Sequence, residues 1–366
     1  MTAVRLSASL ALLVCVAFVY PQRPVEPAHP QSSFASLVAG LSEDPGFFDT
    51  DNLISNERSY LHVVPQLRAL AGQAGGGAYL GVGPDQNFSY IAHLRPSLAI
   101  VIDVRRENLL LHLLFKALFA EARTRVEYLA MLSGRPVPMP LADWPLRPVD
   151  DIVAYIDRTP AMREADVRAM RDRLTRRVDS FGVPLTNGDR TTIDRFHRRF
   201  IADGLSLKFN SHGRPPQYDY PALRDLLLET DREGTRRSYL ASEDDFQFLK
   251  RLQTEDRIVP IVGDLSGGTA LAAVASFLTR ANLQVAAFYT SNVEFYLFGE
   301  GRFDAFVANL RRLPRQPRSV IVRSVFRFGG AARLPGYNSA SLTQSIDTLL
   351  EGYANGRFRE YRELTR

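Results

Sequence analysis

A glycine turn and an acidic residue are spaced as they are in nucleoside-binding sites. The sequence GVGPDQ at residues 81–86, which includes Gly81, Gly83 and Asp85, follows a short apolar run, and Asp103 ends a second apolar run twenty residues after Gly83. Glycine lets a ligand approach the backbone, and an acid at the end of the next strand commonly binds both ribose hydroxyls. Because the motif ends in Gln instead of a third glycine, it favours a nucleoside without phosphates over a dinucleotide. A structural turn followed by a solvated aspartate is the alternative interpretation.

A second acidic residue, Asp264, follows the apolar run at residues 257–263. Its carboxylate could accept a hydrogen bond from an adenine amino group, while the backbone N–H of Leu265 donates to the adenine ring. The alternative is that Asp264 or Ser266 caps the helix that follows, since both residue types are frequent N-caps. The sequence leaves both interpretations open.

Polar and aromatic residues crowd together after the apolar run at residues 283–289. Tyr289, Ser291 and Asn292 are candidates for holding a substrate by hydrogen bonds. Asn292 and Glu294 are the candidate catalytic residues, and Glu294 would act as a base if its pKa were raised. A strand end, a helix cap and buried aromatic side chains are the alternative interpretation.

Three polar residues earlier in the chain, Asn56, Glu57 and Tyr60, could close over a ligand from outside the sheet. In the alternative interpretation, Ser55 and Asn56 only cap a helix. The histidines form no H-x-x-x-H or H-E-x-x-H pattern, and a single cysteine excludes a cysteine-based zinc or iron–sulfur site. We therefore expect no bound metal.

The candidate residues stand at the ends of apolar runs that alternate with helical patterns. We predict strands at residues 78–82, 97–104, 257–263, 283–289 and 319–326. We predict helices at residues 34–41, 56–70, 86–94, 108–122, 266–280, 303–313 and 342–353, and mainly helices between residues 123 and 256. Strands separated by helices imply right-handed crossovers and a mostly parallel sheet, whose carboxyl edge would bring the candidates together.

This pattern predicts an α/β protein with a mostly parallel Rossmann-like sheet and a large helical insertion between the second and third strands. We divide the domain into a first Rossmann-like part at residues 34–122, the insertion at residues 123–256 and a second Rossmann-like part at residues 257–366. Residues 1–33 form a separate signal- or anchor-like segment with a proline-rich linker. The apolar run at residues 6–20 has the length of a signal-peptide core and is short for a membrane span.

Localisation stays open at this point. If residues 6–20 are a true signal, the protein is exported or attached to a membrane through them; if they come from a misassigned start, it is cytoplasmic. The net charge is +5, and residues 161–200 carry ten arginines against six acids, a balance that could suit nucleic acid or an anionic membrane. We favour a solvated helical face with internal ion pairs and expect no nucleic-acid partner.

Four short segments resemble the strand-end motifs of class I S-adenosylmethionine-dependent methyltransferases: GVGPDQ, VIDVRREN, VGDL and FYTSNVE. Four longer blocks resemble a family of uncharacterised bacterial proteins with a methyltransferase-like Rossmann fold: LISNERSYLHVVPQL, YLGVGPDQNFSYIAHLRP, DVRRENLLLHLLFKALF and FYTSNVEFYL. The second resemblance covers nearly all of residues 34–366. The first resemblance implies S-adenosylmethionine as the cofactor, with Gly81 and Gly83 against its methionine part, Asp103 on its ribose and Asp264 on its adenine.

Three functions remain open. The first is methyl transfer from S-adenosylmethionine to a small-molecule or otherwise unknown acceptor. The second is a non-catalytic nucleoside- or metabolite-binding module, which is favoured by the lack of an acid at residues 78–80, where these methyltransferases usually carry one. The third is an exported protein of another function, since a fold does not fix a function.

Overall fold

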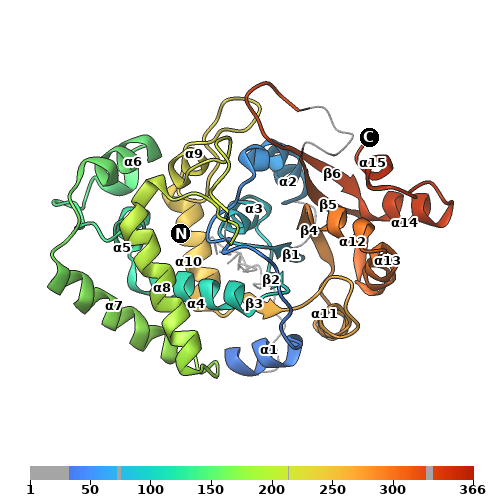
Figure 1. Ribbon diagram of the computed structural model, residues 1–366, viewed down its shortest axis with the longest axis horizontal. Helices are drawn as coiled ribbons and strands as arrows, with labels where there is room; N and C mark the ends of the chain where they lie inside the picture. The colour runs from blue at the N-terminus through green and yellow to red at the C-terminus, as the bar shows by residue number, and fades with distance from the viewer. Residues whose placement is uncertain (1–32, 72–75, 213, 327–332) are drawn as a thin grey trace, which may run out of the picture. The chain divides into compact units, whose positions relative to one another are not determined.

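The computed structural model describes residues 33–71, 76–212, 214–326 and 333–366. These residues form an α/β fold around one six-stranded sheet (Figure 1). The strands follow the order β3-β2-β1-β4-β5-β6 across the sheet. Their bounds are β1 Ala78–Val82, β2 Leu98–Asp103, β3 Ile258–Val262, β4 Val285–Ser291, β5 Arg315–Val325 and β6 Ala340–Ser345.

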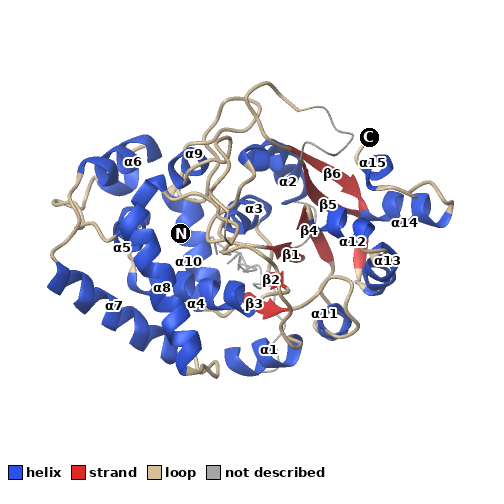
Figure 2. Ribbon diagram, in the orientation of Figure 1, coloured by secondary structure: helices blue, strands red, loops and turns tan. Residues whose placement is uncertain are grey.

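Helices surround the sheet (Figure 2). Outside the segment between β2 and β3 they are α1 Phe34–Leu41, η1 Arg58–Val63, α2 Val64–Ala71, α3 Gln86–Leu94, α11 Ala270–Arg280, α12 Val293–Gly299, α13 Phe303–Arg312, α14 Ile346–Ala354 and α15 Tyr361–Leu364. Between β2 and β3 they are α4 Arg106–Glu121, α5 Arg125–Ser133, η2 Trp144–Leu146, α6 Val149–Arg158, α7 Glu164–Asp179, α8 Asn187–Asp203, η3 Gly204–Ser206, α9 Leu223–Leu227 and α10 Glu243–Thr254.

The prediction of a mostly parallel sheet is confirmed. β1 pairs with β2 and β4, β2 with β3, and β4 with β5, all in parallel. Every residue of the inner strand β1 and of the edge strand β3 is buried, because helices cover both faces of these strands, and this is why their sequences are apolar without alternation. The strand order reverses between β1 and β4, and open α/β sheets bind ligands at such a point.

The last strand corrects one sequence prediction. We predict a helix over residues 342–353, but residues 340–345 form β6, which pairs antiparallel with β5, and α14 begins only at residue 346. The buried hydroxyls of Ser339 and Ser341 lie 2.8 and 3.1 Å from Ser59 Oγ. Polar contacts therefore hold this strand in place, and apolar periodicity cannot reveal a strand of that kind.

One segment crosses the carboxyl edge of the sheet, and we call it the strap (residues 42–57). The backbone N–H groups of Glu43 and Gly46 donate to carbonyl oxygens at the end of β3 (3.0 Å) and just after β2 (2.8 Å). Glu57, at the other end of the strap, reaches Tyr289 of β4 and Ser324 of β5. The strap therefore forms an outer wall over the ends of the strands.

An aromatic cluster joins the sheet to the helices between β2 and β3, which lie to the left of the sheet in Figure 1. Phe88 of α3 lies edge to face with Phe115 and Phe119 of α4, with ring centroids 5.6 and 5.3 Å apart. Phe119 also stacks on Phe246 of α10 at 5.2 Å. Helix α4 thus contributes to the hydrophobic core of the sheet region and to that of the other helices between β2 and β3.

No helix among the described residues is long and apolar enough to cross a membrane. Residues 6–20, on which the prediction of a signal or an anchor rests, lie outside the described residues.

Candidate functional site

The glycine turn follows β1 at the carboxyl edge of the sheet. Gly83 has φ +84°, a conformation that favours glycine. Asn87 of α3 holds the turn, because its Nδ2 donates to three consecutive carbonyl oxygens at 2.9, 3.2 and 2.8 Å. A Cβ at Gly81 would collide with Asn87 Oδ1 and with the Tyr79 hydroxyl. The turn itself therefore requires Gly83, whereas internal packing requires Gly81.

Buried polar atoms without hydrogen-bond partners gather around Gly83. Among the described residues, no partner exists for Gln86 Oε1, for His112 Nδ1 or for either side-chain atom of Asn108. Gln86 follows Gly83 in the turn, His112 Nε2 lies 2.9 Å from the Gly83 carbonyl oxygen, and Asn108 precedes His112 by one turn of α4. We call Gln86, Asn108 and His112 the Gly83 cluster. Because each unpaired buried group costs about 1–3 kcal/mol, this place is suited to receive a hydrogen-bonding partner.

The protonation of His112 decides which partner fits. Burial lowers the pKa of His112 to about 4, so its ring is neutral at pH 7. Nε2 faces the carbonyl oxygen of Gly83 and must carry the proton, which leaves Nδ1 as an acceptor. With the amide oxygens of Gln86 and Asn108, the cluster presents three acceptors and one amide donor. A ligand with several donor groups would satisfy it.

Asp103, predicted to bind a ribose, ends β2 and pairs with Arg105. Its Oδ1 accepts from the backbone N–H and the Nε of Arg105 at 2.9 and 3.0 Å, and its Oδ2 accepts from Nη2 at 2.9 Å. Arg105 Nη1 also donates to the Thr50 carbonyl oxygen of the strap at 2.9 Å. A carboxylate accepts about four hydrogen bonds, so roughly one position of Asp103 stays available.

Asp85 and Tyr60 both have partners within the protein. The Tyr239 hydroxyl donates to Asp85 Oδ2 at 3.1 Å, and burial raises the pKa of Asp85 to about 6. The Tyr60 hydroxyl donates to the Leu226 carbonyl oxygen at 2.8 Å. These two contacts join the start of α3, where Asp85 is the N-cap residue, and η1 to the segment between β2 and β3.

Asp264 opens the turn between β3 and α11. Its Oδ1 accepts from the N–H and the hydroxyl of Ser266, both at 2.8 Å, and its Oδ2 lies 2.5 Å from Arg302 Nη2. Leu265 is buried, and its carbonyl oxygen accepts from Asn309 Nδ2 at 3.0 Å. The predicted alternative, in which Asp264 or Ser266 caps the next helix, is wrong, because α11 begins at Ala270 with Thr269 at its N-cap position; Asp264 instead holds the turn that precedes the helix.

A buried carboxyl group joins the strap to β4 and β5. Glu57 is 1% exposed, and its Oε2 accepts from the Tyr289 hydroxyl at 2.5 Å and from the Ser324 hydroxyl. Its Oε1 accepts from the Ser291 hydroxyl. Burial raises the pKa of Glu57, while the three hydroxyls act in the opposite direction. The Tyr289 hydroxyl also accepts from Gln86 Nε2 at 3.1 Å, which links Glu57 to the Gly83 cluster.

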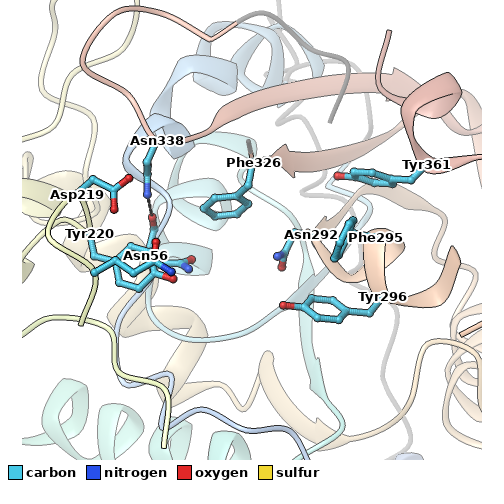
Figure 3. Close-up of a pocket in the computed structure, with 10 residues that line it drawn as sticks. Asn56, Asp219, Tyr220, Asn292, Phe295, Tyr296, Phe326, Asn338 and Tyr361 are labelled. Atoms are coloured by element: carbon cyan, nitrogen blue, oxygen red, sulfur yellow. Dashed lines mark hydrogen bonds between the residues drawn. The ribbon is translucent and has the colours of Figure 1, made fainter. Parts of the chain in front are cut away.

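A cavity of about 370 Å³ lies beyond the carboxyl ends of β4 and β5 (Figure 3). Three asparagines from separate segments line it: Asn56 of the strap, Asn292 before α12 and Asn338 before β6. Asn338 Nδ2 donates to the Asn56 carbonyl oxygen at 2.8 Å. Five aromatic residues also line the cavity: Tyr220, Phe295, Tyr296, Phe326 and Tyr361. Asn56 and Asn292, predicted for cofactor and substrate respectively, thus share one cavity.

Glu294, the candidate base, is fully buried in α12 and paired with Arg323 of β5. Arg323 Nε lies 2.6 Å from Glu294 Oε2, and Nη2 lies 3.1 Å from Oε1. Arg323 Nη1 also donates to Gln344 Oε1 at 2.7 Å. In this arrangement Glu294 fixes α12 to the sheet, because its bidentate contact with Arg323 of β5 engages both carboxylate oxygens.

The sequence reasoning missed the Gly83 cluster as a group of site residues. A signal was present, because Asn108, His112 and Lys116 stand four residues apart on one face of α4, where buried polar side chains are uncommon. The pairing of Glu294 with Arg323 could not be seen, since 28 residues of intervening sequence carry no indication of it. Among the described residues, no group of three or more His, Cys, Asp or Glu side chains could hold a metal ion.

One family model, described as "Domain of unknown function (DUF7790)", matches residues 53–136 and 221–348, which is more than half of the chain. The matched residues include all six strands, the Gly83 cluster and Glu57 with its three hydroxyl partners. Residues 137–220, which hold α6, α7 and α8, lie outside the match. No curated protein matches the chain.

Proposed function

We propose that this chain, which belongs to the DUF7790 family, is an S-adenosylmethionine-dependent methyltransferase. The observation that carries the proposal is the Gly83 cluster, a set of unpaired buried polar atoms at the carboxyl edge of the sheet. It lies beside the point where the strand order reverses, where α/β sheets bind nucleosides and nucleotides. The cavity beyond β4 and β5 offers a separate space for an acceptor.

A Rossmann-like, methyltransferase-like fold with a helical insertion between the second and third strands is part of the same proposal. The order β3-β2-β1-β4-β5 with one antiparallel strand at β6 supports it, and so does the position of α4 to α10 between β2 and β3. An insertion of this size would cover the carboxyl edge and contribute Gln217, Asp219 and Tyr220 to the acceptor cavity.

The residues present fit the polar groups of S-adenosylmethionine. The three acceptors of the Gly83 cluster would take hydrogen bonds from its ammonium group, and Asn108 Nδ2 would donate to its carboxylate. The remaining acceptor position of Asp103 would hold a ribose hydroxyl. Asp264 and Leu265 follow β3, on the adenine side of such a site.

The residues of this chain would contribute position and exclusion of water. S-adenosylmethionine supplies a methyl group on a sulfonium, which is already a good leaving group, so the protein needs little acid–base chemistry. The strap closes the carboxyl edge, and Glu57 holds the Ser291 hydroxyl beside Asn292 at the cavity. Alignment of the reacting groups and removal of water can account for most of the rate in such a reaction.

Calorimetric titration of the full chain with S-adenosylmethionine and S-adenosylhomocysteine tests the proposal. We expect micromolar dissociation constants for both compounds. Asn108→Leu should weaken both at least tenfold, because it removes one donor and one acceptor from the Gly83 cluster. Absence of binding by a well-folded chain would overturn the proposal.

The stability of the same variant, Asn108→Leu, gives a second test. It distinguishes an amide kept for ligand binding from an amide that stabilises the fold. Replacing an unpaired buried amide by an apolar group of similar size removes a desolvation cost, so Asn108→Leu should raise the free energy of unfolding by about 1 kcal/mol. Asn309→Leu is the matched control, because Asn309 Nδ2 donates to two carbonyl oxygens at 3.0 and 2.6 Å. That control should lose stability in the same urea titration.

A further inference from the structure

The lining of the cavity beyond β4 and β5 identifies a class of ligand. Five aromatic rings and three asparagine side chains surround about 370 Å³, a volume at the lower end of small-molecule pockets. We propose that this cavity binds an uncharged, planar aromatic compound with a hydrogen-bonding substituent. The role of that compound as a methyl acceptor rests on the proposed function, whereas the preference for this class of ligand rests on the cavity alone.

Charge excludes one large class of compounds from this cavity. Among the described residues that line it, none is Lys, Arg or His, and one is acidic, Asp219. Arg58, whose backbone N–H approaches Asn338 Oδ1 at 3.5 Å, holds its side chain 3.0 Å from Glu229. A phosphate or carboxylate that entered the cavity would lose its hydration, and none of the described lining residues is a cation that could replace it. The described lining therefore favours an uncharged ligand over an anion.

The arrangement of the rings favours an aromatic ligand over a saturated one. Phe295 lies edge to face with Tyr296 and with Tyr361, with ring centroids 5.4 and 5.5 Å apart. Figure 3 shows these three rings on one side of the cavity, Tyr220 on the other side and Phe326 between them. Aromatic rings gain from offset and edge-to-face contact with another ring beyond the burial of area, and a flat ligand can make such contacts with several of these rings.

The asparagines supply polar groups without charge. Asn56, Asn292 and Asn338 reach the cavity from three different segments, and Figure 3 shows Asn292 between the two aromatic sides. An amide offers both donors and acceptors, so it can bind a phenolic hydroxyl or a ring nitrogen. Amides at these positions therefore orient a substituted ring within the cavity.

Three naphthalene derivatives test the preference, with calorimetry on the full chain as the readout. 2-Naphthol is uncharged and flat, 2-naphthoate is its anionic counterpart, and decahydro-2-naphthol has the same skeleton without aromatic rings. We expect 2-naphthol to bind, decahydro-2-naphthol to bind at least fivefold more weakly and 2-naphthoate at least tenfold more weakly. Equal or tighter binding of either comparison compound would overturn the inference, and so would failure of all three to bind.

A pair of variants assigns the binding to this cavity. Tyr296 is 36% exposed, so Tyr296→Leu should fold normally, and it should weaken 2-naphthol at least fivefold. Phe248→Leu is the matched control. Phe248 belongs to α10, its ring packs under the guanidinium of Arg95, and it is not part of the cavity lining. Unchanged affinity of the Tyr296 variant, or an equal loss in the control, would contradict the assignment.

The two proposals fail in distinguishable ways. 2-Naphthol needs no cofactor to bind. Binding of 2-naphthol without binding of S-adenosylmethionine would therefore support the aromatic site and overturn the proposed methyltransferase. Binding of S-adenosylmethionine without binding of 2-naphthol would support the cofactor site and overturn the proposal of an aromatic ligand. Tyr296→Leu should leave the affinity for S-adenosylhomocysteine unchanged, since Tyr296 lines this cavity and is not among the residues proposed to hold the cofactor.

Discussion

Three buried carboxyl groups at the carboxyl edge of the sheet are held in three different ways. Glu294 is paired with Arg323, Glu57 accepts hydrogen bonds from three hydroxyls, and Asp85 accepts one from Tyr239. Burial raises the pKa of Glu57 and of Asp85, and the hydroxyls that donate to these two carboxyl groups act in the opposite direction.

Asp85 makes the stability of the folded chain depend on pH. Its pKa rises from 3.8 to about 6 on folding, so between these values the folded state binds more protons than the unfolded state. The contribution of this carboxyl group to stability therefore falls as pH rises through that window, by about 3 kcal/mol in total. Asp85→Asn cannot titrate, and relative to the native chain it should gain most of this amount, about 2 kcal/mol, between pH 4 and pH 7.

Urea titrations of the native chain and Asp85→Asn at several pH values measure that difference. Other titrating groups cancel when the two free energies of unfolding are subtracted at each pH. A difference that stays constant from pH 4 to pH 7 would show that the folded state does not perturb Asp85.

Gly81 allows a second prediction at the residue scale. Gly81→Ala places a methyl group against Asn87 Oδ1 and the Tyr79 hydroxyl, which are hydrogen-bonded to each other at 2.7 Å. Overpacking of this kind should lower the free energy of unfolding by about 1–3 kcal/mol in a urea titration. Gly268→Ala is the control, since a Cβ there meets nothing within 4 Å. Similar stabilities for the two variants would contradict the role of Gly81 in packing.

At the scale of elements, apolar strands were predictable and polar contacts between distant segments were not. The apolar runs at residues 78–82 and 98–103 indicate strands because helices bury both of their faces. β6 escaped prediction because its buried serine, Ser341, pairs with Ser59, which lies 282 residues away in the sequence. For the same reason Glu57, Tyr289 and Ser291 could each be proposed for a site, while their mutual contacts could not be foreseen.

The strap should owe much of its position to one side chain. Glu43 Oε1 accepts from the Asp264 N–H at 2.6 Å, and its Oε2 accepts from the Ala270 N–H at 3.0 Å, at the start of α11. Glu43→Ala removes both bonds and the carboxylate that caps this helix, which should cost about 1–2 kcal/mol. Hydrogen exchange of the Asp264 and Ala270 amides should speed up accordingly.

Asp44→Ala is the matched control for this element, because Asp44 is the exposed neighbour of Glu43. It should change the free energy of unfolding by less than about 0.5 kcal/mol and leave both amides protected. Equal effects of the two substitutions on exchange would mean that general charge, and not the cap, holds the strap.

At the scale of the whole molecule, the helices between β2 and β3 and the sheet share one core. Phe115 of α4 contacts Phe88 of α3 on one side and Phe200 of α8 on the other, at 5.6 and 6.0 Å between ring centroids. Contacts that are this apolar differ from the more polar interfaces at which domains move relative to one another. We therefore expect both parts of residues 33–366 to unfold together.

The single tryptophan makes that expectation measurable. Trp144 lies in η2, among the helices between β2 and β3, and packs edge to face on Tyr155 at 4.9 Å, so its fluorescence reports on those helices. Hydrogen exchange of peptides from β1 and β4 reports on the sheet. In urea the two probes should have the same midpoint, because loss of α4 removes the core of both parts at once. A lower midpoint for Trp144 would mean that the helices unfold first, and that the sheet retains its stability without the aromatic cluster around Phe88 and Phe119.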